Sequence, residues 1–227
     1  MFHDRADAGR RLAARLARYK GQDAVVFALP RGGVPVAEPV AAMLRAPLDL
    51  VLARKIGVPR QPELAMGAVA DGGSPVVVRN EDVIAMTGVD EAEFDAVCQR
   101  ELAEIERRRR SFLGTRVPSE VEGRVAIVVD DGVATGATTR AALRAVRARR
   151  PRTLVLAVPV APPDALELLT SEADEIICLE VHADFGAIGY FYADFHQLDD
   201  REVIAILDRF PSGKGEAPQS PRRSTRG

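Results

Sequence analysis

The stretch VAIVVDDGVATGATT, residues 125–139, decides the fold, because a strongly β-branched run leads through a polar turn into a helical pattern. Residues 125–129 predict a buried strand, and residues 138–149 predict the helix that follows it. Asp130 and Asp131 stand at the carboxyl end of that strand. In open α/β sheets, ligands bind at this end of the strands. The segment therefore predicts both a sheet and the edge at which its ligand binds.

The loop after this strand has the composition of an anion-binding turn. Its glycines permit unusual backbone angles, so that successive N–H groups point into one concavity. Hydrogen bonds to a charged oxygen contribute roughly 1.5–3 kcal/mol each and a helix dipole only about 0.3–1 kcal/mol, so amides and hydroxyls should dominate binding. The residues expected to bind a phosphate here are Gly132, Ala134, Thr135, Gly136, Ala137, Thr138 and Thr139.

Asp130 and Asp131 would repel a phosphate unless another group compensates their charge. Ribose hydroxyls supply hydrogen-bond donors, and a hard divalent cation such as Mg²⁺ supplies positive charge. A phosphorylated sugar with vicinal hydroxyls and bound Mg²⁺ meets both demands. The alternative is a capping and turn pair between a strand and a helix, which is the commoner explanation for two such residues in isolation. The Thr-Gly-Ala-Thr-Thr continuation favours the ligand site.

Two other nucleotide-binding motifs fit this segment poorly. A Walker loop requires Gly-Lys-Ser/Thr, whereas Gly136 is followed by Ala137 and Thr138. A dinucleotide fingerprint requires GxGxxG ahead of an acidic residue, whereas here the acids precede the glycines. The residues therefore favour a sugar phosphate over ATP or a dinucleotide.

Strand and helix patterns alternate on both sides of the segment. Asp4 is placed to cap a first helix that Gly21 ends. Further strands are expected at residues 24–29, 48–53, 154–160 and 175–181, with a weaker one at 76–78, and further helices at 36–44 and 163–171. This order predicts right-handed βαβ crossovers and therefore a doubly wound, mostly parallel α/β sheet flanked by helices.

The chain has 227 residues, a length that suits one domain with an insertion. Residues 80–114 interrupt the alternation with a purely helical pattern, in which Asp90 and Glu93 resemble a capping box. We expect this segment to be a helical insertion above the sheet. Residues 211–227 contain Pro, Gly, Ser and charged residues without an apolar anchor, so they are predicted to be a disordered tail. A single domain is expected over residues 1–210.

The charge distribution argues against a nucleic-acid partner. The formal net charge is −2, and the arginine run 107–110 ends a Glu-rich helix, where it is expected to be a solvated face that compensates the helix dipole. Residues 1–19 are charged throughout, and no apolar run is long enough to span a bilayer, so no membrane partner is expected. Cys98 and Cys178 are far apart and are predicted to be buried thiols of a cytoplasmic protein.

Two further loops add positive charge at the same sheet edge. The sequence PRGG follows the first strand, and the amides of Gly32 and Gly33 with the guanidinium of Arg31 form a second anion site suited to pyrophosphate. The alternative is an ordinary turn whose arginine is solvated. Arg54 and Lys55 close the next strand, so two more cations are expected to converge where a diphosphate would lie.

Residues 56–66, IGVPRQPELAM, are rich in turn-forming residues. One interpretation is a mobile loop that closes over a ligand, with Arg60 as an additional phosphate contact. A static connector is the alternative, and the residues favour neither.

Residues 183–197 concentrate aromatic side chains in a chain with only 5% aromatic residues. Phe185 and Tyr190 are candidates to stack on a planar ligand, although aromatic residues at this spacing more often belong to a core. His182 and His196 lack an obvious partner carboxylate at a catalytic spacing and are interpreted as ordinary histidines.

The order of a hydrophobic strand, Asp-Asp, Gly, two residues and Thr-Gly-x-Thr resembles the motif with which type I phosphoribosyltransferases bind 5-phosphoribosyl-1-pyrophosphate (PRPP). The RGG loop, the Arg-Lys pair and the stretch GVPRQPELAMGA resemble uncharacterised bacterial members of similar length. The resemblance implies that Asp130 and Asp131 face the ribose hydroxyls, directly or through Mg²⁺. It also implies that residues 134–139 hold the 5-phosphate and that the PRGG loop binds pyrophosphate.

In the family, residues after the last strands form a hood over the acceptor, which here corresponds to residues 182–198. The expected reaction transfers the 5-phosphoribosyl group from PRPP to a nitrogen acceptor such as a nucleobase, with Asp130, Asp131, Arg31 and Lys55 as catalytic residues. A PRPP-sensing regulator without catalytic activity is an alternative, and a phosphate-releasing hydrolase is a weaker one. The acceptor and the oligomeric state are left open, although exposed strand edges are compatible with a homodimer.

Overall fold

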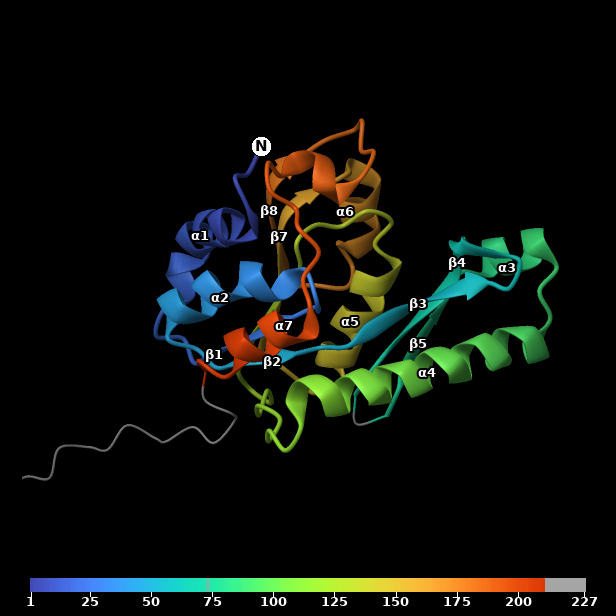
Figure 1. The fold of residues 1–227 in the computed structure, drawn as a ribbon, viewed down its shortest axis with the longest axis horizontal. Helices are drawn as coiled ribbons and strands as arrows, with labels where there is room; N and C mark the ends of the chain where they lie inside the picture. Colours follow the sequence, from blue (N-terminus) through green and yellow to red (C-terminus); the bar gives the residue numbers. More distant parts are fainter. Residues whose placement is uncertain (73, 211–227) are drawn as a thin grey trace, which may run out of the picture.

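The computed structural model describes residues 1–72 and 74–210 (Figure 1). Its centre is a five-stranded parallel sheet in the order β2-β1-β6-β7-β8. The strands are β1 (Ala24–Ala28), β2 (Leu48–Leu50), β6 (Val125–Val129), β7 (Thr153–Ala161) and β8 (Glu175–Val181). Every residue of β1 and β6 is buried, as expected for central strands covered on both faces.

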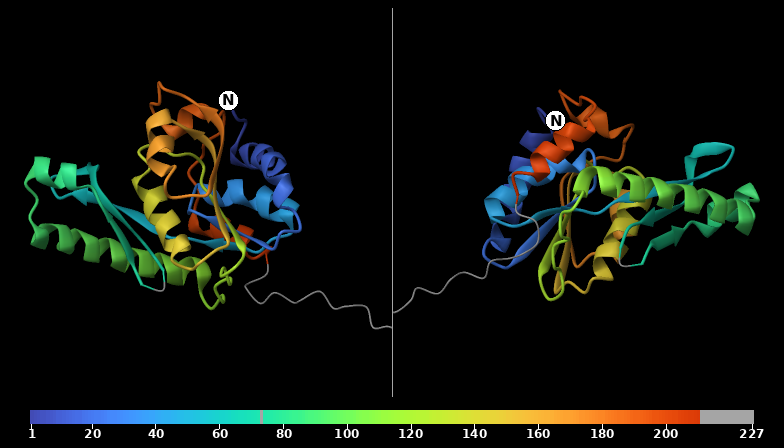
Figure 2. Two further views of the ribbon diagram at one scale, coloured as in Figure 1. Left: turned by 180° about the vertical axis from the view of Figure 1, so that it is seen from behind. Right: turned by 60° about the horizontal axis from the view of Figure 1, so that its bottom comes forward.

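Helices cover both faces of this sheet, which confirms the doubly wound α/β fold (Figures 1 and 2). One face carries α1 (Arg5–Leu16), the short 3₁₀ turn η1 (Ala17–Tyr19), α2 (Gly33–Leu44) and α7 (Asp200–Leu207). The other carries α5 (Ala137–Arg147) and α6 (Pro163–Leu169). Alternate side chains of each strand enter the two apolar layers, as the pleat of a strand requires.

The strand order reverses between β1 and β6. From β1 the chain continues to β2, which lies on one side of β1, and from β6 it continues to β7, which lies on the opposite side of the sheet. Ala28 pairs with Val129 at the carboxyl end of both strands, so the two following loops begin side by side. Such a reversal opens a crevice at the carboxyl edge, where ligands of this architecture bind.

A second unit projects from this body, and we call residues 53–113 the arm (Figure 1). Its antiparallel sheet contains β3 (Ala53–Val58), β4 (Gln61–Ala70) and β5 (Val76–Arg79). The helices α3 (Glu81–Thr87) and α4 (Glu91–Leu113) follow, and α4 begins with the predicted Asp90–Glu93 capping box. Phe94, Val97 and Ile105 of α4 are buried, as their spacing predicts.

Several boundaries differ from the sequence expectations. Residues 56–66 form an ordered hairpin instead of an irregular connector, because most of them lie in β3 and β4, with Arg60 at the turn; movement of this hairpin over a ligand stays a prediction. The strand expected at residues 76–78 belongs to the arm instead of the central sheet. Helix α7, with its own capping box at Asp199, was not predicted. The expected tail, residues 211–227, lies outside the described residues.

The remaining composition-based expectations concern exposed charge and cysteine. Each arginine of the run 107–110 pairs with Glu104 or Glu106 one turn earlier, which confirms a self-compensated helix face. Cys98 is buried, whereas Cys178 is only partly buried, and both thiols are free. In the described part of the chain, no helix combines the length and the hydrophobicity that crossing a membrane requires.

Candidate functional site at the carboxyl edge of β1 and β6

The PRGG loop after β1 and the Asp130–Asp131 pair after β6 touch each other. A methyl group placed on Gly32 would lie 2.0 Å from Oδ2 of Asp131, and one placed on Gly33 would lie 2.7 Å from the carbonyl oxygen of Val129. Neither distance leaves room for a side chain. The two glycines are therefore required for the two loops to meet.

Asp131 is held by residues from both ends of the chain. Nε of Arg5, the first residue of α1, donates a hydrogen bond of 2.8 Å to Oδ2 of Asp131, and both side chains are buried. Nη1 of Arg5 donates to the carbonyl oxygen of His196 at 2.9 Å. The Tyr192 hydroxyl donates to the backbone carbonyl of Asp131 at 2.6 Å. Arg5 and Tyr192 were not predicted, because no local motif links residues so distant in sequence.

The two adjacent carboxyls have unusual electrostatics. Burial, followed by the negative charge of Asp131, holds the pKa of Asp130 well above its usual value. Burial also raises the pKa of Asp131, while the guanidinium of Arg5 opposes that rise. One acid is thus paired with a cation, and its neighbour lacks such a partner among the described residues. A ligand that brings positive charge or hydroxyl donors would relieve this imbalance.

A divalent cation fits this pair only in part. No three His, Cys, Asp or Glu side chains among residues 1–72 and 74–210 are grouped so that they could hold a metal ion. Mg²⁺ commonly binds through one or two carboxylates and completes its octahedron with water and ligand phosphate oxygens. Asp130 and Asp131 therefore suit an Mg²⁺ ion that arrives together with a phosphorylated ligand.

The loop between β6 and α5 presents unpaired amides. Gly136 adopts a left-handed conformation, with φ 81°, immediately before the helix begins. The first intrahelical bond runs from Arg140 N to Gly136 O, at 2.8 Å, so the amides of Ala137, Thr138 and Thr139 lie in the first turn without an intrahelical acceptor. Such a turn is an anion site.

The side chains of this loop differ in access. Ala134 and Thr135 are exposed, and Thr138 is half-buried. Thr139 is only 3% exposed, so its side chain is less accessible to a ligand than those of Thr135 and Thr138. Gly132 is buried against the hood, because a methyl group on it would lie 2.8 Å from Cγ2 of Ile188. Ile188 is a neighbour that sequence reasoning missed.

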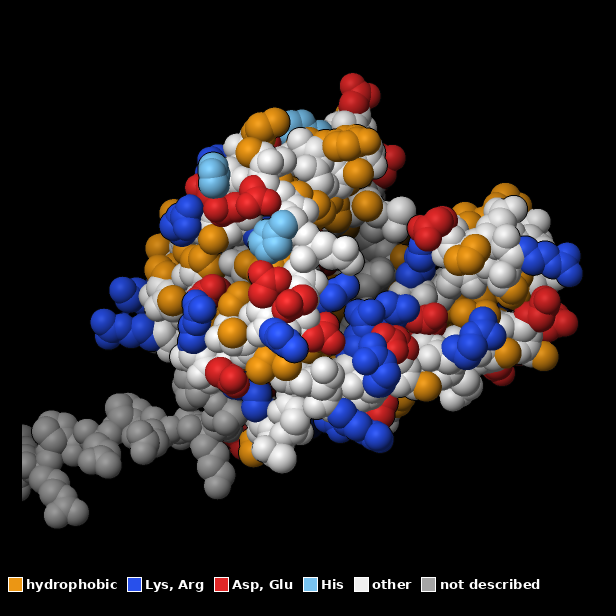
Figure 3. Space-filling view, in the orientation of Figure 1, with side chains coloured by type: hydrophobic (Ala, Val, Ile, Leu, Met, Phe, Trp, Pro, Cys, Tyr) orange, Lys and Arg blue, Asp and Glu red, His pale blue; other side chains and the backbone are white. Residues whose placement is uncertain are grey.

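A cavity of about 780 Å³ separates this loop from the arm, and its mouth is the hollow between body and arm in Figure 3. Ala134, Thr135 and Ala137 line one side, and Lys55 of β3 lines the other. Lys55 therefore lies across a cavity from the segment predicted to bind the 5-phosphate, and not in the cavity beside the PRGG loop, where the sequence placed it with a diphosphate. Nζ of Lys55 donates to the carboxylate of Glu63 on β4 at 3.0 Å, and Glu63 is itself almost fully exposed.

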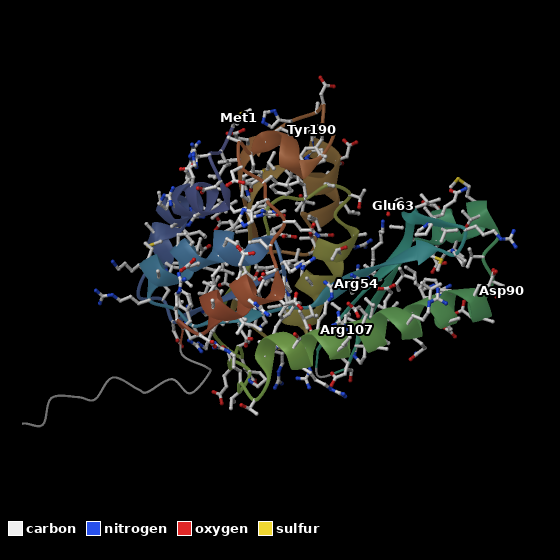
Figure 4. All side chains as sticks on the ribbon, in the orientation of Figure 1. Met1, Arg54, Glu63, Asp90, Arg107 and Tyr190 are labelled. Carbon is white, nitrogen blue, oxygen red and sulfur yellow. The ribbon has the colours of Figure 1, made fainter. Side chains whose placement is uncertain are left out.

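Arg54 has a different environment from its neighbour Lys55. Its Nε donates to Oε2 of Glu101 on α4 at 2.7 Å, in a half-buried ion pair. Figure 4 shows Arg54 at the root of the arm, where Figure 3 shows basic side chains gathered. Arg54 does not appear among the described residues that line either cavity of this edge. Its positive charge is already compensated, so it ties α4 to β3.

A second cavity, of about 370 Å³, lies against the PRGG loop. Arg31 and Gly32 form one wall, Arg5 another, and residues 195–198 of the hood the third. Nη1 of Arg31 is 3.6 Å from Oδ1 of Asp200, a loose and partly exposed pair. The guanidinium of Arg5 lies 3.8 Å from the ring centroid of Phe195. Two guanidinium groups and Gly32 thus surround one hollow. Contrary to the sequence expectation, the Gly33 amide is not free for an anion, because it donates to the carbonyl of Leu29 at 2.9 Å.

The hood consists of residues 182–198 and includes the 3₁₀ helix η2 (Ile188–Phe191). Phe185 stacks on Phe191 with ring centroids 5.0 Å apart, and Tyr190 is 74% exposed at the outer surface (Figure 4). The structure brings neither ring into the two cavities. Phe195 is the hood aromatic that faces the PRGG loop.

The two hood histidines do have partner carboxylates, contrary to the sequence interpretation. Nε2 of His182 lies 3.1 Å from Oε2 of Glu180, and Nε2 of His196 lies 3.0 Å from Oε1 of Glu202. Glu202 follows His196 by six residues, in the unpredicted helix α7, so no catalytic spacing revealed it. Both pairs are at the surface, and His182 packs against the Phe191 ring.

The chain is similar to known proteins over most of its length. Residues 2–195 match the family model described as the phosphoribosyl transferase domain. Proteins from two strains of Mycobacterium tuberculosis, provisionally named as phosphoribosyl transferases, are 49% identical over 209 residues, which is 92% of this chain. The chain spans 47% of the length of these relatives.

Superposition on a solved structure supports the fold. The crystal structure of the protein TT1426 from Thermus thermophilus superimposes with a TM-score of 0.79 at 41% identity. The match covers 93% of this chain and all of that one. The match therefore includes most of both the body and the arm of the present chain.

Proposed function

We propose that this chain, which belongs to the phosphoribosyl transferase family, binds PRPP in the crevice between β1 and β6 and transfers its 5-phosphoribosyl group to a nitrogen acceptor. One observation carries the proposal: two glycine-containing loops, each followed by a helix, flank a pair of buried carboxyls at the switch point of the sheet. A ligand with two separate phosphate groups and hydroxyl donors between them would satisfy all three parts.

The β6–α5 loop is assigned to the 5-phosphate. The first-turn amides of α5 and the exposed side chain of Thr135 supply donors, and the helix N-terminus supplies a partial positive charge. The two carboxyls are assigned to the ribose. Asp130 accepts hydrogen bonds from the vicinal hydroxyls, and Asp131 uses the oxygen that Arg5 does not occupy.

The PRGG loop is assigned to the pyrophosphate. Departure of pyrophosphate from the anomeric carbon leaves an oxocarbenium-like centre, so the site must stabilise growing negative charge on the leaving group. Arg31 and Gly32 line the cavity where that charge develops, and Lys55, which lines the separate cavity beside the β6–α5 loop, would approach the pyrophosphate when the arm closes. Mg²⁺, when bound by Asp130, Asp131 and substrate oxygens, supplies further positive charge to the phosphates.

Water must be kept from the ribosyl cation while the acceptor attacks. Ile188 and the hood cover Gly132 from one side, and the β3–β4 hairpin faces the crevice from the other. The acceptor is proposed to be a nitrogen heterocycle such as a nucleobase, held between the hood and the ribose. Phe185 and Tyr190 point elsewhere, so the acceptor ring is assigned to the neighbourhood of Ile188.

A consumption assay tests the proposal. The protein is incubated with PRPP and Mg²⁺ against a panel of purines, pyrimidines and related heterocycles, and release of pyrophosphate is followed together with formation of the ribosylated product. We expect one acceptor class to give the two products in equal amounts. Binding of PRPP without turnover across the panel would identify a sensor instead of an enzyme, and phosphate release without any acceptor would identify a hydrolase.

A further inference from the structure

Arg5 is the most unusually placed cation of the described chain. It is only 9% exposed, although arginine is rarely buried without a specific partner. Two of its nitrogens are engaged by distant segments, Nε by Asp131 and Nη1 by the His196 carbonyl. Its plane also lies over the Phe195 ring. One side chain from the first turn of α1 thus joins the β6–α5 loop to the hood.

The needs of α1 do not explain this position. Asp4 already caps the helix by accepting from the amide of Asp7. Arg11 shows how an ordinary arginine of this helix behaves, because it is half exposed and pairs with Asp7 one turn earlier. Such surface pairs contribute little to stability. Burying Arg5 costs desolvation free energy that a surface position would avoid, so the site is where its role lies.

The guanidinium of Arg5 still has donors available to a ligand. Within residues 1–72 and 74–210, its Nη2 has no hydrogen-bond partner, and the side chain lines the cavity that also contains Arg31 and Gly32. Guanidinium groups bind phosphate oxygens through their planar, forked N–H groups. Arg5 and Arg31 therefore face one anion-sized hollow from two elements.

Arg5 also removes a repulsion that the site would otherwise contain. Oδ2 of Asp131 lies directly against Gly32, in the loop assigned to the pyrophosphate. A bare carboxylate at this place would repel the leaving group. The 2.8 Å contact from Nε of Arg5 compensates that same oxygen.

We propose that Arg5 is a pyrophosphate-binding residue of the site, with one edge of its guanidinium fixing Asp131 and the other donating to the pyrophosphate beside Arg31. This inference rests on the function proposed above. It adds helix α1 to a site that is otherwise built from loops of the sheet and from the arm. Lysine cannot replace arginine here, because a single ammonium does not reach Asp131, the His196 carbonyl and the anion in one plane.

The test compares three ligands on four proteins by calorimetry in the presence of Mg²⁺. The ligands are pyrophosphate, ribose 5-phosphate and PRPP, so that the two halves of the substrate are probed separately. The proteins are the wild type, Arg5→Gln, Arg5→Lys and the matched control Arg11→Gln, which removes an exposed arginine from the same helix. The thermal unfolding midpoint of each variant is recorded alongside. Arg5→Lys keeps a cation beside Asp131, so it replaces Arg5→Gln in the binding comparison if Arg5→Gln does not fold.

The proposal predicts a selective loss. Arg5→Gln should weaken pyrophosphate and PRPP binding by at least about tenfold, because charge-assisted hydrogen bonds to the anion are lost. Arg5→Lys should remain weakened by at least about threefold for the same two ligands, since it lacks the fork. Ribose 5-phosphate should bind all four proteins within about threefold, and Arg11→Gln should match the wild type throughout.

Two results would overturn the inference. One is unchanged pyrophosphate affinity in Arg5→Gln or full recovery in Arg5→Lys. The other is an equal loss for all three ligands accompanied by a lowered unfolding midpoint, which would make Arg5 a structural residue only. A wild-type protein that binds neither pyrophosphate nor PRPP would instead contradict the proposed function, so the two failures are distinguishable.

Discussion

The body and the arm both contribute to the crevice, but they hold their charged residues in different ways. In the body, Asp131 and Arg5 are buried and fixed by hydrogen bonds from three segments. In the arm, Lys55 is held by Glu63, which is almost fully exposed. A buried pair is costly to disturb, whereas an exposed pair exchanges readily with a ligand. We infer that the body is the rigid half of the crevice, which determines the ligand, and that the arm is the adjustable half, which closes on it.

Among single substitutions in the body, Gly32→Ala should disturb the fixed arrangement of Asp131 and Arg5 most strongly. The new methyl group would lie 2.0 Å from Oδ2 of Asp131, so the carboxylate and its partner Arg5 must move. We expect a loss of about 1–3 kcal/mol in unfolding free energy and a roughly 100-fold loss of PRPP affinity. Denaturant unfolding and calorimetry measure the two effects.

The matched control for that variant is Gly57→Ala in the arm. Its methyl group would lie 2.4 Å from the carbonyl oxygen of Pro62, so the β3–β4 hairpin must shift by a similar amount. PRPP affinity should stay within about threefold of the wild type, because no body residue moves. Equal losses of affinity in the two glycine variants would remove the distinction between body and arm.

Asp71 directly follows β4, at the root of the arm, and accepts a hydrogen bond from the amide of Leu52. Burial raises its pKa to about 6, above the value of an unfolded chain. The folded protein therefore binds more protons between about pH 4 and pH 6, and its unfolding free energy falls as pH rises through that window.

Asp71→Asn keeps the acceptor for Leu52 and removes the buried charge. At about pH 7.5 the variant should be more stable than the wild type by about 3 kcal/mol, and at about pH 4 the two should coincide. Urea unfolding at several pH values measures this difference. A pH-independent difference would show that Asp71 does not titrate as described.

Lys55→Gln tests the adjustable half directly. Lys55 lines the cavity beside the β6–α5 loop and not the one beside the PRGG loop, so its charge reaches the leaving group only when Glu63 releases it and the arm moves toward the PRGG loop. We expect kcat to fall by about tenfold while PRPP affinity falls by less, because the charge on pyrophosphate grows in the transition state. A loss confined to affinity would place Lys55 in ground-state binding alone.

Glu63→Gln should have the smallest effect. Removing the exposed partner of Lys55 frees the ammonium group, and exposed pairs contribute at most about 1 kcal/mol. PRPP affinity should rise by up to about threefold at low salt and match the wild type at high salt. A fall in affinity would mean that Glu63 itself contacts the substrate or positions Lys55.

The body was predictable from sequence because its signals are local. The β-branched run before Asp130 and the apolar run before PRGG each predict a strand ending in a ligand-binding loop. Parallel pairing then brings the two loops together without any further information. The capping box at Asp90 likewise predicted the start of α4.

The arm and the deeper contacts were less predictable, for physical reasons. The β3–β4 hairpin contains Pro59 and Pro62, and proline residues favour turns over strands. The pairing of Arg54 and Lys55 with residues of β4 was therefore not predicted. Arg5 and Asp131 are separated by 126 residues in the sequence, and no periodic pattern predicts a contact at that separation. Glu202 was missed as the partner of His196 because α7 was not predicted.

The most direct test of the central claim is a calorimetric titration of PRPP with Mg²⁺ into the wild type and into Asp130→Asn/Asp131→Asn. The wild type should bind one PRPP per chain, and the double variant should lose at least about 100-fold in affinity, because both carboxyls that face the ribose and Mg²⁺ are replaced. Equal affinity of the two folded proteins would contradict the assignment of PRPP to the crevice between β1 and β6.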